Sequence, residues 1–405
     1  MELIMLRYVF AVSLLTFFLT PAVSASAQAN GVIEIPVWVY DQGRFVDDLA
    51  PEDFEIYENG VLQNTASLRL IKQQSAVREV NTGPASPGLR RNFYLLYQTT
   101  DWDPTLGEAI SYLFRSLVLP GDTMTLVTPM APYSLAPDAL TRKSKAALSK
   151  EMQQILRKDI QRGGGDYRNT IRDLRRIVGA IGGYQQSMES DVESDAVGSS
   201  FGLEMQLDRY KQGLMKIDNI RLLDQSKLTD FAEALKKLPG RTFVFFFYQR
   251  EFRPEISPQA MAALMDMYQD TPNIRGDLQD LFQYYRRDSI LDAGLIKRAF
   301  ADACLTFSFI FMNKESRYMS GANMREQSED VFPLFSGIAR ATGGVAYNSQ
   351  NAAASFKTAA GASKEYYLLS YDSSNPDKDG GFRQIEVKIK DRNYQISSRA
   401  GYYAR

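Results

Sequence analysis

Apolar and polar residues alternate in short runs at both ends of the chain. Near the start, the runs within 32–70 end at turns over 41–43 and 58–60, the second of which contains Asn-Gly. Asn-Gly between apolar runs is a strong signal for a β-hairpin. Near the end, 382–390 alternates in the same way and needs a second sheet to cover its apolar face. The pattern therefore predicts a β-sandwich-like module built from both chain ends.

The middle of the chain follows a different pattern, in which short and almost wholly apolar runs are separated by segments with helical spacing. Strands without polar alternation are buried on both faces, as in a parallel sheet covered by helices. The apolar runs are 93–97, 124–127, 243–248, 305–311 and 365–371. The helical segments are 141–160, 169–181, 203–238 and 258–303, with breaks at 163–166 and 190–200. We therefore expect an α/β fold with an open, Rossmann-like sheet and helices on both faces.

The chain is predicted to consist of five parts. They are a signal peptide over 1–29, an N-terminal β module over 30–71, a linker over 72–91, an α/β domain over 92–369, and closing strands over 370–405 that pair with the N-terminal module. The α/β domain carries two helical insertions, at about 141–238 and 254–303, because these stretches are longer than a crossover between strands needs.

The first residues predict export. An apolar run over 8–19 is followed by Pro21 and by the small-residue sequence Ala-Ser-Ala at 25–27. The run is shorter than the ~20 residues that a bilayer span requires, and no cysteine near the cleavage site offers a lipid attachment point. We therefore expect a secreted or periplasmic protein without a stable membrane anchor.

Composition excludes several classes of function. The 47 basic and 48 acidic residues nearly cancel, so nucleic acid is not an expected partner. The chain contains no histidine and a single cysteine, Cys304, in an apolar context. Without histidine, the usual general base, the Ser/His and Cys/His nucleophile pairs and the commonest transition-metal ligand are all missing. We therefore expect a protein that is not an enzyme.

Several segments, taken together and in order, resemble one family. They are the opening β stretch 39–60, Leu-Pro-Gly-Asp at 119–122, Leu-Pro-Gly-Arg at 238–241, Ile-Ala-Arg-Ala-Thr-Gly-Gly at 338–344 and the closing aromatic stretch 364–403. In this arrangement the chain resembles the von Willebrand factor A-related (VWFA-related) domain proteins of bacteria. The resemblance implies a VWA-like fold with a metal-ion-dependent adhesion site at the carboxyl ends of the strands.

The positions that match this metal site carry no carboxylate. They are Gln98, Thr100 and Trp102 after the first strand of the sheet, and Gln249 after the 243–248 strand. Mg²⁺ and Mn²⁺ require oxygen ligands with carboxylate charge to offset their dehydration. The resemblance therefore implies a degenerate site, and we expect no cofactor.

A shifted register provides an alternative metal site. It uses Asp101, Asp103 and Thr105, with Asp166 or Thr170 from the glycine-rich stretch as a further ligand, and would hold Mg²⁺ or Mn²⁺. Without a metal, Asp101 and Asp103 have a plain structural role, since both can cap the helix that begins at Pro104. The triple glycine at 163–165 is interpreted as a flexible loop, because the Lys-Ser/Thr of a phosphate-binding loop does not follow it.

Aromatic residues at the same edge are candidates for partner binding. Tyr97, Trp102 and Tyr248 are expected to lie together at the carboxyl ends of neighbouring strands, either as an anchor for a protein partner or as a plug of the vacated site. The leading function is therefore protein recognition or scaffolding in the cell envelope or exterior. The alternatives are a cation-dependent adhesion module that uses Asp101 and Asp103, and a hydrolase that uses carboxylates such as Glu251 with Asp101.

Overall fold

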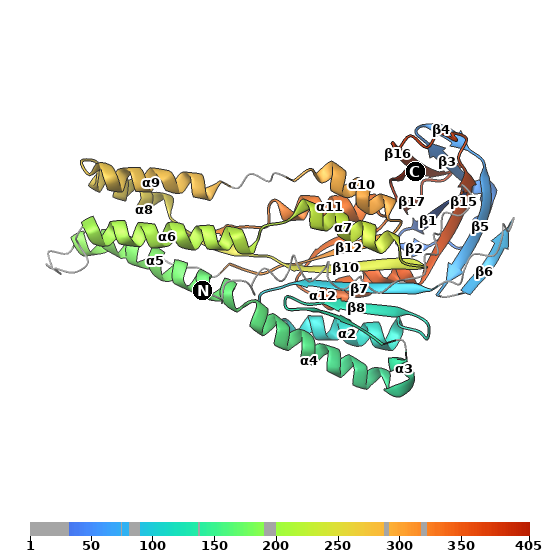
Figure 1. Ribbon diagram of the computed structural model, residues 1–405, viewed down its shortest axis with the longest axis horizontal. Coiled ribbons are helices and arrows are strands. Elements are labelled where there is room, and N and C mark those ends of the chain that lie inside the picture. Colours follow the sequence, from blue (N-terminus) through green and yellow to red (C-terminus); the bar gives the residue numbers. More distant parts are fainter. Residues whose placement is uncertain are drawn as a thin grey trace.

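The computed structural model describes residues 32–73, 75–80, 90–136, 138–189, 200–286, 291–316 and 322–405. Along its long axis the chain forms a part made of two sheets, a central α/β part and a helical arm that projects away from the sheets (Figure 1). The predicted signal peptide at 1–29 and most of the predicted break at 190–200 lie outside the described residues. Among the helices of the described residues, none combines the length and the apolar character needed to cross a bilayer.

The central sheet has six strands, of which five are parallel. In spatial order they are β14 (Ala346–Ser349), β12 (Thr306–Met312), β10 (Arg241–Gln249), β7 (Arg91–Gln98), β8 (Thr123–Val127) and β9 (Pro132–Ser134). Only the edge strand β9 runs antiparallel to its neighbour. Every residue of β10 and β12 is buried, which explains why these segments show no polar alternation in the sequence.

Helices cover both faces of this sheet. One face packs against α2 (Pro104–Ser116), α4 (Lys145–Gly163) and α12 (Ala352–Ala359). The other face packs against α7 (Gln225–Lys236), α10 (Ala293–Asp302) and α11 (Val331–Ala341). The short helix α3 (Ala139–Arg142) precedes α4, and the 3-10 turn η2 (Ala360–Ser363) follows α12. The prediction of an α/β fold is confirmed.

The two-sheet part contains strands from both chain ends. Its first sheet holds β17 (Gln395–Ser398), β1 (Val32–Asp41), β15 (Glu365–Asp372), β5 (Thr65–Lys72) and β6 (Ser75–Val80), with β2 (Arg44–Phe45) beside β1. Its second sheet holds β18 (Gly401–Tyr403), β16 (Phe382–Ile389), β3 (Phe54–Glu58) and β4 (Val61–Gln63), with the 3-10 turn η1 (Pro51–Asp53) before β3. The two sheets bury one common apolar core. The predicted hairpin joins β3 to β4, where Asn59 and Gly60 have φ of 48° and 80°.

A buried carboxylate joins the two chain ends. Glu58, at the end of β3, is 3% exposed and accepts hydrogen bonds from the hydroxyls of Tyr371 (2.6 Å), Ser373 (2.8 Å) and Tyr402 (3.0 Å). Arg383 of β16 lies 3.7 Å from the same carboxylate. A buried charge needs such partners, so the opening strands depend on the closing ones.

Three strands differ from the predictions: β15, β6 and β14. The run 365–371 was expected in the parallel sheet, but β15 is antiparallel between β1 and β5. Its residues are apolar on both faces because Tyr367 and Leu369 face the second sheet while Tyr366 and Leu368 face the α/β core. The predicted linker 72–91 contains a strand, β6, which pairs with β5. The fifth parallel strand is β14, which is too short and too polar to be recognised from its sequence.

The helical arm is made by parts of the two predicted insertions. It consists of α5 (Gly165–Glu189), α6 (Ser200–Ile220), α8 (Pro258–Met267) and α9 (Pro272–Tyr285), which share an apolar core of their own (Figure 1). The ribbon of β11 (Phe252–Ile256) and β13 (Ala322–Glu326) lies at its base. The predicted flexible loop at 163–165 is wrong, because α4 extends to Gly163 and α5 begins at Gly165.

Candidate functional site

The candidate site is the carboxyl edge of the parallel sheet, where β7 and β10 end side by side. The chain leaves β7 toward α2 on one face of the sheet, whereas β10 is followed by the β11 ribbon and the arm. In open α/β sheets, ligands bind in the crevice outside the carboxyl ends of strands at such a switch point. The segment that follows β7 (99–103) is called the edge loop here.

Gln249, the last residue of β10, holds the edge loop in place. Its amide oxygen Oε1 accepts hydrogen bonds from Thr100 N (3.0 Å), Thr100 Oγ1 (3.1 Å) and Asp101 N (3.0 Å). Gln249 and Thr100 are 7% and 6% exposed. An amide oxygen with three donors has no lone pair left for a cation. Gln249, one of the positions of the expected degenerate site, therefore cross-links the edge loop to β10.

Two basic side chains lie against the same loop. Lys314, which follows β12, forms an ion pair with Asp101. Arg168 of α5 donates hydrogen bonds to the backbone oxygens of Thr100 and Gln161. This approach needs Gly164, because a Cβ there would collide with the Thr100 carbonyl. Lys314 thus occupies the carboxylate of Asp101, and Arg168 adds a positive charge beside the loop.

The carboxylates of the alternative metal site have other partners. Asp103 caps α2, since its Oδ1 accepts from Thr105 N (2.8 Å) and Thr105 Oγ1 (2.7 Å). The capping prediction is confirmed for Asp103, whereas Asp101 pairs with Lys314. Asp166 lies in the first turn of α5. No group of three or more Cys, Asp or Glu residues in the described ranges is arranged to hold a metal ion.

Of the four positions expected to form a degenerate metal site, only Thr100 and Gln249 are in contact. The sheet register pairs Gln98 with Tyr248, so Gln98 and Gln249 point to opposite faces of the sheet. Trp102 turns back onto α2, where its ring lies next to Gly107 and packs on the apolar core. The four positions of the degenerate site therefore form no single cluster, because Gln98 is in register with Tyr248 and Trp102 packs on α2.

The three aromatic residues do not lie together either. Tyr97 is fully buried and its ring stacks on Phe247, with centroids 4.6 Å apart and planes at 8°. Tyr248 is 4% exposed on the opposite face, where it stacks on Phe311 at 6.1 Å. Burial raises the pKa of both tyrosines. Tyr97, Trp102 and Tyr248 therefore form no common surface, and the prediction of a shared aromatic anchor is wrong.

Glu251 belongs to a buried ion pair. Its Oε2 lies 2.6 Å from Arg221 Nε, and both side chains are 2% exposed. Arg221 also donates to the backbone oxygen of Gln327 and lies 3.4 Å from the Tyr248 hydroxyl. Glu251 and Asp101 are thus each bound to a different basic residue. This arrangement gives no support to a hydrolase that uses the two carboxylates as a pair.

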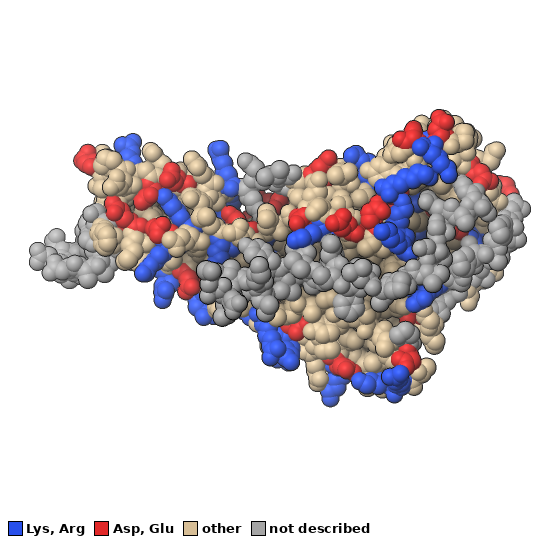
Figure 2. Space-filling model, viewed as in Figure 1, with Lys and Arg blue, Asp and Glu red and all other residues tan. Residues whose placement is uncertain are grey.

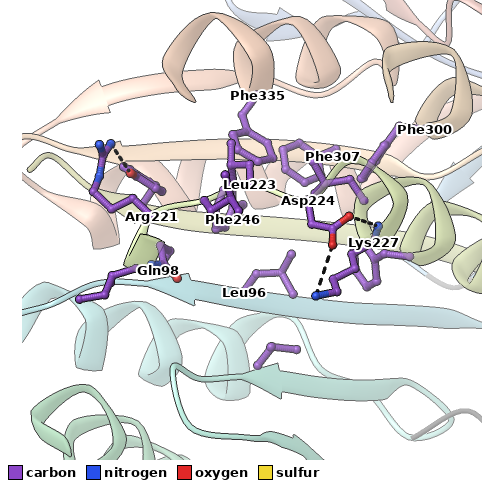
Figure 3. A pocket seen from close by; sticks show the side chains of 16 residues that line it. Leu96, Gln98, Arg221, Leu223, Asp224, Lys227, Phe246, Phe300, Phe307 and Phe335 are labelled. Carbon is purple, nitrogen blue, oxygen red and sulfur yellow. Dashed lines mark hydrogen bonds and ion pairs between the residues drawn. The ribbon is translucent and has the colours of Figure 1, made fainter. Parts of the chain in front are cut away.

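Two cavities lie beside the edge. The larger, of about 510 Å³, separates the edge loop from α5. The smaller, of about 140 Å³, lies under α7 and is lined by Leu96, Phe246, Phe300, Phe307 and Phe335 (Figure 3). Gln98, Arg221 and an Asp224–Lys227 ion pair of 3.3 Å supply polar groups to the lining of the smaller cavity. Oε1 of Gln98 is buried and has no hydrogen-bond partner among the described residues.

Sequence reasoning missed the basic residues of the edge. The sequence contained two signals for them. Lys314 follows a buried strand, and α5 carries arginines at helical spacing, at 168, 172 and 175. Elsewhere on the arm, acidic and basic side chains are interspersed over the visible face (Figure 2). The chain matches no protein-family model, no curated protein and no solved structure in the three comparisons.

Proposed function

We propose that the chain is an exported, non-catalytic recognition or scaffold protein whose VWA-like domain makes its contacts without a metal ion. The strand order supports the VWA-like, Rossmann-like part of this proposal. Numbered along the chain, the six strands of the central sheet lie in the order 3-2-1-4-5-6, with helices on both faces. The two sheets around one core support a β-sandwich-like module made from both chain ends.

One observation carries the metal-free part of the proposal, namely the three hydrogen bonds that converge on Gln249 Oε1. These bonds occupy the Gln249 oxygen that a cation would need as a ligand, and they hold the edge loop against β10. Arg168 adds positive charge at the same loop, and Lys314 engages the carboxylate of Asp101. Recognition at this edge then depends on the shape of the loop and on its fixed charges, as in ordinary protein interfaces.

The non-catalytic part rests on the residues available for chemistry. The chain has no histidine, and Asp101 and Glu251, the two carboxylates considered for hydrolysis, are each engaged by a basic residue. Export is supported by the apolar run and the small-residue cleavage sequence at the start of the chain. A protein partner in the cell envelope or exterior fits both features.

Calorimetric titration with Mg²⁺ and Mn²⁺ tests the proposal, with the Asp101→Ala variant as the matched control. We expect no saturable heat at up to about 1 mM cation for either protein, a concentration well above the affinity of a dedicated site. In parallel, the chain is used to capture partners from the native envelope fraction with and without a chelator. Capture should not change with the chelator. Micromolar cation affinity that Asp101→Ala abolishes would establish a cation-dependent adhesion module instead.

A further inference from the structure

The larger cavity at the carboxyl edge is strongly basic. It lies between α5 and the edge of the sheet and is lined by five basic residues, which are Arg168, Arg172, Arg175, Arg250 and Lys314. Three carboxylates line it as well: Asp101, Glu251 and Glu315. This local excess of positive charge stands in a chain whose basic and acidic residues nearly cancel.

Most of the carboxylate charge is already compensated by ion pairs. Asp101 is paired with Lys314. Glu251 is paired with Arg221, which is not part of the lining, at 2.6 Å. Arg250 has its own partner in Glu326, with Nε and Oε1 2.9 Å apart. Among the described residues that line the cavity, the uncompensated charge is therefore that of the three α5 arginines, opposed by Glu315.

The three arginines share one face of α5. Positions 168, 172 and 175 are separated by four and three residues, the spacing that aligns side chains along a helix. The Arg168 guanidinium binds two backbone oxygens, which leaves its charge uncompensated. Nε of Arg175 is buried without a hydrogen-bond partner, and no ion-pair partner of Arg172 or Arg175 occurs in the described part of the chain. Like charges at this spacing destabilise a helix unless a counter-charge lies between them.

We propose that this cavity binds a small anion with at least two negative charges, such as an organic phosphate or a dicarboxylate. Guanidinium groups bind phosphate and carboxylate oxygens through two parallel N–H bonds. The buried Nε of Arg175 is a donor without an acceptor in the part of the chain that the structure describes. The volume of about 510 Å³ falls within the range of small-molecule sites, roughly 300–1,000 Å³. Tyr167, Ile171 and Phe252 supply an apolar wall for the rest of the ligand.

The position of the cavity gives the ligand a structural consequence. The arginines belong to the arm, whereas Arg250 and Lys314 follow strands of the central sheet. An anion bound between them joins the arm to the edge of the sheet, next to the edge loop that Arg168 already contacts. The inference concerns a small ligand and does not depend on whether the edge also recognises a protein.

Calorimetric titration of the full chain with pyrophosphate and with succinate tests the inference and separates its two sources. We expect saturable binding of at least one probe, and an affinity that falls as NaCl is raised, because the contacts are ionic. Arg172→Gln and Arg175→Gln should each weaken binding about tenfold, since each removes one charged fork. Arg172 is exposed, so its substitution changes the charge of the cavity without disturbing a core.

Arg176→Gln is the matched control on the same helix. The Arg176 side chain is 80% exposed, lies 3.9 Å from Asp173 and does not line the cavity, so its loss should leave the affinity unchanged. Binding of pyrophosphate alone assigns the site to phosphates, and binding of succinate alone assigns it to carboxylates. The inference is overturned if neither probe binds, or if the three variants weaken binding equally.

Discussion

The hydrogen bonds of Gln249 allow the edge loop to be tested directly. Replacing Gln249 by Ala removes the acceptor of three bonds, two of them from backbone N–H groups, those of Thr100 and Asp101. Thr100 is buried, so water does not replace the lost acceptor fully. The substitution therefore leaves donors unsatisfied at the point where the edge loop joins β10.

The expected magnitude follows from the number of bonds. A hydrogen bond of this kind contributes about 1 kcal/mol net, so the loss of three destabilises the closed edge loop by about 3 kcal/mol. At about 1.4 kcal/mol for each factor of ten, the equilibrium for opening the loop should rise about 100-fold. The effect is local, because the apolar cores on both faces of the sheet do not involve the removed amide.

Amide hydrogen exchange at Thr100 and Asp101 measures this opening, since exchange reports the local free energy of exposing each N–H. Gln249→Ala should speed exchange at both amides about 100-fold, while amides within β12 keep their protection. Gln249→Glu is the control, because a carboxylate of the same shape still accepts the three bonds. Unchanged exchange in Gln249→Ala, or equal acceleration in both variants, would refute the role assigned to this oxygen.

Three further predictions concern the buried charges. Arg91 donates two hydrogen bonds to the buried Asp122 carboxylate, from Nε at 3.1 Å and from Nη2 at 2.7 Å. Arg91→Met leaves this carboxylate buried without its charge partner and should lower the free energy of unfolding in urea by about 3–5 kcal/mol. The double change Arg91→Met with Asp122→Leu should recover much of this loss. Glu58→Ala should lower the urea midpoint reported by tryptophan fluorescence, whereas Glu58→Gln, which keeps an acceptor for Tyr371, should lower it less. Burial raises the pKa of Glu255, so the native state holds its proton more tightly than the unfolded chain does. The resulting stabilisation is fully present below pH 4.5, the ordinary pKa of a glutamate, and disappears as the pH rises through the raised pKa of Glu255. The melting temperature of the wild type, compared with that of Glu255→Gln, should therefore increase on acidification. A difference independent of pH would contradict this assignment.

Local sequence signals predicted several elements correctly. Asn59-Gly60 gave the hairpin between β3 and β4, because only residues that tolerate positive φ fit that turn. Asp103 before Pro104 gave the start of α2, because a short side-chain oxygen satisfies the first free N–H groups of a helix. The apolar runs of β10 and β12 gave the buried strands of the α/β sheet. Each of these signals depends on a few neighbouring residues.

The sequence by itself thus determined the α/β class, the hairpin, the helix cap and the lack of histidine chemistry, since all of these depend on local geometry or composition. Only the tertiary structure decided where the chemistry lies. Gln98 and Gln249 point to opposite faces of the sheet because Gln98 is in register with Tyr248, and the packing of α5 places Arg168 against the edge loop. The burial of β15 on both faces came from a second sheet, and the same apolar run would equally fit a parallel strand. Contacts between distant segments are set by how whole faces pack, and no short stretch of sequence carries that information.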